Sequence, residues 1–443
     1  MPASTDTIFA LATAAGPAGV AVIRISGPES GEILQALTGR TLPTRRTAKL
    51  RVLKNTAGQV IDEALVLWFL GPASFTGEDM VELHTHGSVA IIEEMSKTLY
   101  GFGLRQAEPG EFTRRAFENG KLDLTEAEGL ADLIDAESEG QRRQALRQMQ
   151  GGLKDTYENW RAKILDALAM VEGEIDFPDE GDVPDALAHR AREGMLSLAE
   201  SLKEALVNSR RGERVRSGLD IAIIGAPNAG KSSILNRLAR RDAAIVSKEA
   251  GTTRDIVEVH THIAGLPVKI SDTAGLRKTD NPIEIEGVRR AKLRARDADL
   301  RLGVIDLTSD NNEVLDALSV GDFILYNKAD LQNFAANEIV SRETFLLSAV
   351  TGDGFEALET TLEREIKSRF SLTEQAGLTR TRHIKCVRSA LSATESALTN
   401  LSVAPELSGA DLRKALHAIK ELAGEADIEA VLDRVFSQFC IGK

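Results

Sequence analysis

A phosphate-binding loop directly after an apolar strand constrains the fold of this chain most. The strand is expected over residues 219–224, and it runs into the loop Gly225-Ala-Pro-Asn-Ala-Gly-Lys-Ser232. The glycines let backbone N–H groups converge on phosphate oxygens, and a helix continuing to Leu238 adds the positive end of its dipole. Lys231 is placed to reach the β and γ phosphates, and Ser232 to ligate Mg²⁺. The sequence therefore predicts a P-loop domain built on alternating strands and helices.

Two further motifs are expected around the metal and the γ-phosphate. Gly251-Thr-Thr-Arg-Asp255 supplies Thr253 as a second Mg²⁺ ligand, because the metal must be held only while the γ-phosphate is present. Asp272-Thr-Ala-Gly275 ends another expected strand. Asp272 can then hold a metal-bound water, and Gly275 can offer its N–H to the γ-phosphate.

Two later motifs predict that the base is guanine. Asn327-Lys-Ala-Asp330 and Ser348-Ala349 each follow a short apolar run. The Asp330 carboxylate can accept hydrogen bonds from the N1 and N2 donors of guanine, which adenine cannot supply. Five motifs at strand ends, in the required order, predict GTP binding. The expected GTP contacts are Asn228, Ala229, Gly230, Lys231, Ser232, Ser233, Ser247, Thr252, Thr253, Asp272, Thr273, Ala274, Gly275, Asn327, Lys328, Asp330, Ser348 and Ala349.

The sequence leaves open which group orients the attacking water. Ras-like enzymes have a glutamine directly after the Asp-x-x-Gly-type motif, but this chain has Leu276, whose aliphatic side chain cannot orient water. Downstream, Glu284 and Glu286 are carboxylates able to do so. They are equally well explained as acids that the dipole favours at the start of a helix.

Positive charge near the β and γ phosphates has more than one possible source. Arg254 and Arg277 lie in the two expected switch segments, where arginines are more often solvated or paired with acids. A monovalent cation held by Asn228 and by first-switch carbonyls is the other candidate.

Length and charge limit the broad class of protein. A chain of 443 residues is expected to form two to four domains. A net charge of -13 argues against coating nucleic acid through a general positive field, so any RNA contact needs a local basic patch. Two cysteines, Cys386 and Cys440, make a disulfide framework unlikely and favour a reducing cytoplasm. We expect neither a secretion signal nor a membrane span.

The pattern of apolar residues divides the chain. Strand-like runs at 20–25, 63–70 and 80–84 and a helix over 88–100 predict a mixed α/β domain at the start. Helices are expected from Leu124 to about Ile175, opened by a capping box of Thr125 and Glu128. A further helix is expected from Asp185 to about Arg211, and the helical pattern returns after residue 371.

Helical segments on both sides of an α/β unit predict one helical domain interrupted by an inserted G domain. The insertion is reasonable because the two ends of such a domain can lie close together. The expected limits are 1–120 for the first α/β domain, 121–214 and 372–443 for the helical domain, and 215–371 for the G domain.

The motifs closely resemble those of the MnmE (TrmE) family, the tRNA uridine modification GTPases of bacteria and organelles, over essentially the whole chain. Besides the nucleotide motifs and Asp272-Thr-Ala-Gly-Leu-Arg277, the resemblance rests on Asp6-Thr-Ile, Arg24-Ile-Ser-Gly-Pro28, Phe75-Thr-Gly-Glu-Asp79, Pro109-Gly-Glu-Phe-Thr113, Arg115-Ala-Phe117, Asn119-Gly-Lys-Leu-Asp-Leu124, Ile175-Asp-Phe-Pro178 and Phe439-Cys-Ile-Gly-Lys443.

The resemblance implies GTP hydrolysis stimulated by K⁺ when two G domains meet. Glu284 matches the catalytic glutamate of the family. The K⁺ positions match Asn228, Ser247, Glu249 and Thr252. It further implies a homodimer that joins a FAD-dependent partner, MnmG, in a heterotetramer. Together they would add an aminomethyl or carboxymethylaminomethyl group at C5 of the wobble uridine of tRNA.

The resemblance also implies a folate site in the first domain, which would dimerise. The cofactor would be a tetrahydrofolate in its 5,10-methylene or 5-formyl form. Folate contacts match Arg24, Glu82, Lys121 and Lys443. From the residues alone, Arg24 is equally a surface charge and Lys121 a side chain at a helix start. Cys440 is either a thiolate at the folate site or a small buried apolar residue.

The chain departs from the family pattern at two places. His86-Gly87-Ser88 replaces the usual His-Gly-Gly, and Ser247-Lys-Glu249 puts charge in the potassium loop. Two other functions stay open: a ribosome-assembly GTPase, which would be expected to carry a basic RNA-binding module, and a folate-binding scaffold that uses GTP only as a conformational switch.

Overall fold

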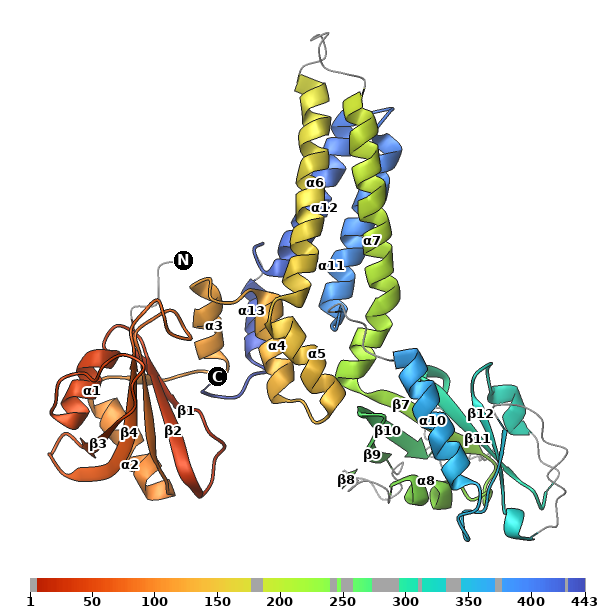
Figure 1. The fold of residues 1–443 in the computed structure, drawn as a ribbon, viewed down its shortest axis with the longest axis horizontal. Coiled ribbons are helices and arrows are strands. Elements are labelled where there is room, and N and C mark those ends of the chain that lie inside the picture. Colours follow the sequence, from red (N-terminus) through yellow and green to blue (C-terminus); the bar gives the residue numbers. More distant parts are fainter. Residues whose placement is uncertain are drawn as a thin grey trace, which may run out of the picture. The chain divides into compact units, whose positions relative to one another are not determined.

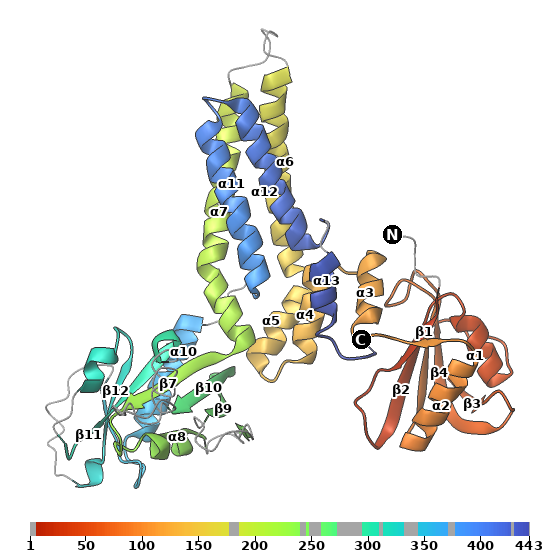
Figure 2. The same cartoon turned by 180° about the vertical axis from the view of Figure 1, so that it is seen from behind.

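The computed structural model describes residues 6–176, 186–239, 245–247, 258–272, 295–309, 313–331, 344–370, 377–426 and 429–442. They fall into two compact units (Figures 1 and 2). The first comprises Met1–Ala131, Arg147–Leu202 and Cys386–Lys443, and the second Asp132–Leu146 and Lys203–Lys385. Within the described ranges, no helix combines the length and the apolarity that crossing a membrane requires.

The first unit begins with a six-stranded sheet in the order β3-β4-β5-β2-β1-β6. Neighbouring strands are antiparallel except for β1 and β6, which are parallel. Apolar residues of α1 and α2 share one core with alternate residues of the strands. The expected strands and helix are confirmed. The bounds are β1 Ile8–Leu11, β2 Ala18–Ser26, α1 Ser30–Thr38, β3 Lys49–Lys54, β4 Val60–Phe69, β5 Met80–Gly87, α2 Val89–Gly101 and β6 Arg105–Gln106.

Ser88 gives the His-Gly-Ser departure a local structural role. Its Oγ accepts a hydrogen bond from the backbone N–H of Ile91 at 3.2 Å and caps the start of α2. A serine oxygen satisfies one of the N–H groups left unpaired at a helix start, which glycine cannot do with a side chain. A Cβ on Gly87 would lie 2.5 Å from the Ala18 carbonyl oxygen, so the close approach there depends on Gly87.

The helical part of the first unit continues from the sheet. It contains α3 Glu111–Glu118, α6 Gly152–Asp176, α12 Pro405–Ala423 and α13 Glu429–Phe436, with parts of α4 Leu124–Ile134, α5 Glu139–Met149, α7 Ala186–Ser217 and α11 Thr381–Asn400. Helices α6 and α12 pack side by side (Figures 1 and 2). Leu412, Ala415, Ile419 and Leu422 of the predicted stripe are buried, while Leu416 is half-buried.

The capping box of α4 lies two residues earlier than the sequence predicts. Asp123 Oδ1 accepts from the Glu126 N–H at 2.9 Å, and Glu126 Oε2 accepts from the Asp123 N–H at 2.7 Å. Thr125 and Glu128 are instead buried within the helix. The prediction was wrong because two pairs, Asp123–Glu126 and Thr125–Glu128, have the spacing of a capping box. Only packing of the helix selects between them.

The chain returns to the first domain at its C-terminal end. Ile441 forms an antiparallel bridge with Pro109, and Gly442 packs so closely on Leu11 that a Cβ would lie 2.3 Å from its carbonyl oxygen. Gly442 also has a φ of 93°, a conformation that favours glycine. The ending of the family motif thus lies against strand β1.

The second unit contains a seven-stranded sheet in the order β13-β12-β11-β7-β10-β9-β8. Five strands are parallel, and β9 and β8 are antiparallel to their neighbours. The bounds are β7 Leu219–Gly225, α8 Lys231–Ala239, β8 Ile245–Ser247, β9 Glu258–Ile263, β10 Leu266–Asp272, β11 Leu300–Asp306, η1 Glu313–Ala317, β12 Phe323–Asn327, η2 Ala329–Leu331, β13 Thr344–Leu346 and α10 Phe355–Phe370. The strands that precede the predicted nucleotide-binding motifs, β7, β10, β12 and β13, are parallel and end at the same edge of the sheet.

The two connections of this sheet to the helices lie close together. A Cβ on Gly212 of α7 would meet the Leu378 carbonyl oxygen at 2.8 Å. Asp132 pairs with Arg216, at the end of α7, and with Arg380, just before α11, at 2.9 and 2.6 Å. This proximity is what an inserted G domain requires. Helix α7 runs to Ser217, beyond the predicted end near residue 211.

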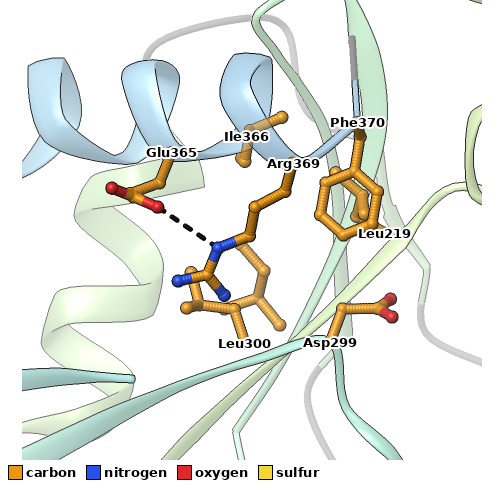
Figure 3. A pocket seen from close by; sticks show the side chains of 8 residues that line it. Leu219, Asp299, Leu300, Glu365, Ile366, Arg369 and Phe370 are labelled. Atoms are coloured by element: carbon orange, nitrogen blue, oxygen red, sulfur yellow. Dashed lines mark hydrogen bonds and ion pairs between the residues drawn. The ribbon is translucent and has the colours of Figure 1, made fainter. Parts of the chain in front are cut away.

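A small pocket lies at the amino ends of β7 and β11, away from the phosphate loop (Figure 3). Its volume is about 260 Å³, including space open to solvent. Its acids are already paired: Glu365 with Arg369 at 3.2 Å, and Asp299 with Arg214 at 2.8 Å. The remaining lining is mostly apolar, so this pocket offers few groups for chemistry.

Candidate nucleotide site

Two glycines allow the phosphate loop to approach neighbouring strands. A Cβ on Gly225 would lie 2.4 Å from the Val304 carbonyl oxygen of β11. Gly230 has a φ of 96°, and a Cβ there would lie 2.1 Å from Asn327 Nδ2. Asn228 also takes a positive φ of 65°, with its side chain exposed. The loop is therefore compact on the protein side and open on the side where phosphates would bind.

Lys231 begins α8 inside the loop. Its side chain is buried, and Nζ donates to the Ala226 carbonyl oxygen at 2.9 Å. Burial lowers the pKa of Lys231, and the negative charge of Asp272 partly offsets this effect. Phosphate oxygens beside the ammonium would favour its charged form further. The local geometry thus places one cation at the start of a helix, where anions bind.

Ser232 and Asp272 form the metal side of the site. Ser232 Oγ donates to Asp272 Oδ2 at 2.5 Å. Asp272 is only 2% exposed, and its Oδ1 has no hydrogen-bond partner among the described residues. A buried carboxylate oxygen without a partner is costly, and hard divalent cations prefer oxygen ligands. This pair therefore fits Mg²⁺, either directly or through a bound water.

Asn327 links the phosphate loop to the base side of the site. Its Nδ2 donates to the Ala229 carbonyl oxygen at 2.8 Å, and its Oδ1 accepts from the Ala349 N–H at 3.1 Å. Asp330 is exposed, and its Oδ1 accepts from Ser348 Oγ at 2.6 Å. Ser348 is fully buried and so holds the Asp330 carboxylate in one orientation. Hydrogen bonds thus join the motifs that follow the three strands β7, β12 and β13.

Arg237 is a residue of this site that the sequence reasoning missed. It lies on α8 with its guanidinium 5.2 Å from the centre of the Phe355 ring, and it donates to the carbonyl oxygens of Ala349 and Thr351 at 3.4 Å each. It therefore braces the loop after β13 against the helix that starts at Lys231. The sequence carries no signal for this contact, because the partners are more than a hundred residues away.

Several predicted residues lie outside the described part of the chain. Ser247 is a partial exception, because the structure describes its backbone, which ends β8 opposite Glu258 of β9, but not its side chain. The others are Glu249, Thr252, Thr253, Arg254, Thr273, Ala274, Gly275, Leu276, Arg277, Glu284, Glu286 and Lys443.

The expected folate residues lie in the first unit. Arg24 and Glu82 are directly opposite each other on β2 and β5, and Arg24 Nε donates to Glu82 Oε1 at 2.9 Å. Glu82 Oε2 also lies 3.2 Å from Nε2 of His84, a residue the sequence reasoning missed although positions 82 and 84 share one face of a strand. Lys121 has a different partner, since its Nζ donates to the Pro72 carbonyl oxygen at 3.0 Å.

Cys440 is exposed, so its interpretation as a small buried residue was wrong. Its carbonyl oxygen accepts a hydrogen bond from the Gly110 N–H at 3.5 Å, which places the C-terminal segment beside the start of α3.

Comparison with known proteins decides the family. Residues 7–121 match the model for the GTP-binding protein TrmE N-terminus, and residues 124–440 match the model for the MnmE helical domain. The chain belongs to the MnmE family. A relative from Maricaulis maris is 55% identical over 440 residues, which cover 99% of both chains. Relatives from Caulobacter vibrioides and Paramagnetospirillum magneticum are 50% and 48% identical over 99% of this chain and all of theirs.

All three relatives are named tRNA modification GTPase MnmE. Membership of this family, together with the phosphate loop and the base-side motifs described above, makes the chain a P-loop GTP hydrolase. Such enzymes require Mg²⁺, in agreement with the buried, unpartnered oxygen of Asp272.

Proposed function

We propose that this GTPase acts in the cytoplasm, with a flavoprotein partner of the MnmG type, on C5 of the wobble uridine of tRNA. The product would be an aminomethyl or carboxymethylaminomethyl uridine, with the one-carbon unit taken from a tetrahydrofolate. The observation that carries the proposal is likeness to tRNA modification GTPases along the whole chain, rather than over the G domain alone.

The proposed nucleotide step uses groups of this chain in distinct roles. Lys231 holds phosphate oxygens, and Asp330 reads the guanine edge. Mg²⁺, when bound at Ser232 and Asp272 with Thr253, would screen the negative charge of the phosphates. Asn228, whose exposed amide lies at the open side of the loop, is proposed to ligate K⁺ together with Ser247, Glu249 and Thr252. Glu284 is proposed to orient the attacking water, because Leu276 cannot do so.

Replacing Glu284 with alanine is expected to lower the GTP turnover number about 100-fold in KCl, because a positioned acid–base group typically contributes this much or more. GTP binding should stay unchanged. Turnover of the unaltered protein should also fall when NaCl replaces KCl. Both rates are measured as phosphate release at saturating GTP. The Glu286→Ala variant is the matched control and is expected to retain turnover.

Equal, slow rates for all three proteins in both salts would contradict a catalytic role for Glu284. They would instead favour a scaffold that uses GTP only as a conformational switch.

The face of the first sheet that carries Arg24 and Glu82 supports the proposed folate site and homodimer. Leu50, Leu65 and His84 lie in one row across β3, β4 and β5, and Leu50 and Leu65 are 54% and 45% exposed. An open apolar surface beside a fixed carboxylate suits a flat pterin ring, whose N–H groups can donate hydrogen bonds to the carboxylate. The same surface is proposed to be covered by a second copy of the chain.

Substituting Glu82 with glutamine is expected to weaken binding of 5-formyltetrahydrofolate about 10- to 100-fold, because a charged hydrogen-bond acceptor is lost. Isothermal titration calorimetry on the full chain measures this. Lys97→Ala, exposed on α2, which covers the opposite face of the sheet, is the control and should bind like the unaltered protein. Equal affinity of the Glu82→Gln variant would remove Glu82 from the proposed site.

The wobble uridine itself provides the test of the whole proposal. Mass spectrometry of tRNA from a strain lacking the gene should show loss of the modified wobble uridine, and a plasmid copy should restore it. A copy carrying Lys231→Ala should not restore it. Unaltered wobble uridines in the deletion strain would refute the proposed action on tRNA but would not affect the conclusion that the protein hydrolyses GTP.

A further inference from the structure

Lys328 adopts a conformation that needs an external constraint. It follows β12 with a φ of 69°, in the left-handed region that residues other than glycine rarely occupy. Such a conformation persists where surrounding contacts fix it, and these positions cluster at functional sites. Hydrogen bonds fix both neighbours of Lys328. Asn327 bonds to the phosphate loop and to the loop after β13, and the Ala329 N–H donates to the Leu347 carbonyl oxygen at 3.0 Å. The side chain of Lys328 turns to a different strand.

The partner of Lys328 is Asp306, the last residue of β11. Lys328 Nζ lies 2.5 Å from Asp306 Oδ2, and both side chains are partly shielded from solvent, with exposed fractions of 30% and 13%. Asp306 and Asn327 are register neighbours in the parallel pair of β11 and β12. The carboxylate therefore lies at the nucleotide edge of the sheet, beside the motif that reads the base.

Asp306 is itself fixed by the turn that follows it. Its Oδ1 accepts from the N–H and the hydroxyl of Thr308, at 2.9 and 2.7 Å. The Leu307 N–H also donates to the Asn327 carbonyl oxygen at 3.2 Å. Burial alone would raise the pKa of Asp306, but the hydrogen bonds from Lys328 and Thr308 hold it below its ordinary value. One oxygen of the charged carboxylate thus accepts hydrogen bonds from its own turn, and the other pairs with Lys328.

We propose that Asp306 is a positioning residue for guanine nucleotides and that it acts only through Lys328. By holding the ammonium at the strand edge, Asp306 fixes the path of the Lys328 stem and the backbone between Asn327 and Asp330. The Lys328 stem and this backbone segment are then already in place when GTP binds, so binding costs less conformational entropy. The inference rests on the proposed nucleotide contact of Lys328, which the test therefore examines separately.

The test compares Asp306→Asn, Lys328→Met and the double variant in the full chain. Asp306→Asn keeps the size of the side chain but places an amide where Lys328 needs a carboxylate. We expect the Kd of a fluorescent GDP analogue and the KM for GTP to rise about 10-fold, with little change in kcat, because a charged hydrogen bond that prepares binding is lost. In the Lys328→Met background the same substitution should add less than about 2-fold, because residues that act through one contact are not additive.

The matched control is Asp322→Asn. Asp322 joins the same two strands at their opposite ends, where it pairs with Arg301 Nη1 at 3.1 Å and accepts from the Arg301 N–H at 2.9 Å. This variant should unfold at a lower urea concentration without a change in the Kd of the GDP analogue. Asp306→Asn should show the reverse pattern, which a merely structural role at the strand end would not produce.

Three results would overturn the inference. An unchanged Kd in Asp306→Asn, while Lys328→Met weakens binding, removes Asp306 from the site and leaves the contact of Lys328 standing. Effects that multiply in the double variant show that Asp306 acts by another route. A Lys328→Met variant with ordinary affinity would refute the proposed contact of Lys328 as well.

Discussion

Replacing Asp330 with asparagine is expected to weaken GTP binding about 1,000-fold and to create a preference for xanthosine triphosphate, because two charge-assisted hydrogen bonds are lost. The Asp330 carboxylate only accepts hydrogen bonds, which suits the N1 and N2 donors of guanine. An asparagine amide can donate to the 2-oxo group of xanthine, which replaces the amino group of guanine. Ser348, which holds Asp330 Oδ1 at 2.6 Å, can fix an amide oxygen in the same place.

Competition binding with GTP, XTP and ATP measures this change of preference. Asp353→Asn is the control, since Asp353 lies on the loop after β13 with its carboxylate on the hydroxyl of Thr351. It should keep its preference for GTP. An Asp330→Asn variant that still bound GTP with ordinary affinity would show that another group reads the base.

Replacing Arg115 with alanine is expected to lower the unfolding free energy of the first domain by about 3–5 kcal/mol, because it removes a buried cation and breaks its ion pair with the mostly buried Glu78. The guanidinium is 3% exposed and contacts Asp6, Glu78 and Glu111 at 2.8, 3.1 and 3.0 Å. Glu78 also accepts from Ser26 Oγ at 2.7 Å. Arg115 therefore links four segments of the first domain, and the more exposed Arg105 also pairs with Asp6 and Glu111 at 2.8 and 2.7 Å.

Urea titration followed by tryptophan fluorescence measures this loss. The chain has two tryptophans, Trp68 in the first sheet and Trp160 in α6, so a Trp160→Phe background reports on the first domain. Arg114→Ala is the control on the same helix: it removes more exposed pairs with Glu118 and Asp433 and should shift the urea midpoint far less. A loss below about 1 kcal/mol for Arg115→Ala would show that Glu78 finds another partner or becomes protonated.

Local patterns predicted the elements of this protein well where the chemistry is local. The phosphate loop needs glycines, a lysine and a serine in fixed order, and the structure places Gly230, Lys231 and Ser232 at the start of α8 as expected. Strands β2, β4 and β5 of the first sheet were predicted from short apolar runs between glycines and prolines, but β1, β3 and β6 were missed. The α4 capping box was misplaced because Asp123–Glu126 and Thr125–Glu128 are both acceptable pairs, and burial of Thr125 decides between them.

The contacts that complete the candidate sites depend on residues far apart in the sequence. His84 meets Glu82 on the strand face also reached by Arg24, and Arg237 and Asp306 brace the base motifs from other elements. His84, Arg237 and Asp306 lie outside the motifs found in the sequence, since their contacts come from the register of paired strands and the packing of α8. Sequence motifs predict the residues that contact the ligand, whereas only the tertiary structure shows which residues position those contacts.

Selective retention of GTP by the unaltered full-length protein is the most direct test of the central claim, that Lys231 holds a triphosphate whose base Asp330 reads. Equilibrium binding with GTP and ATP in the presence of Mg²⁺ should give an affinity for GTP at least about 1,000-fold higher, as expected when adenine leaves the hydrogen-bond acceptor of the site without its donors. Equal affinities for the two nucleotides, or no binding of either, would contradict the account.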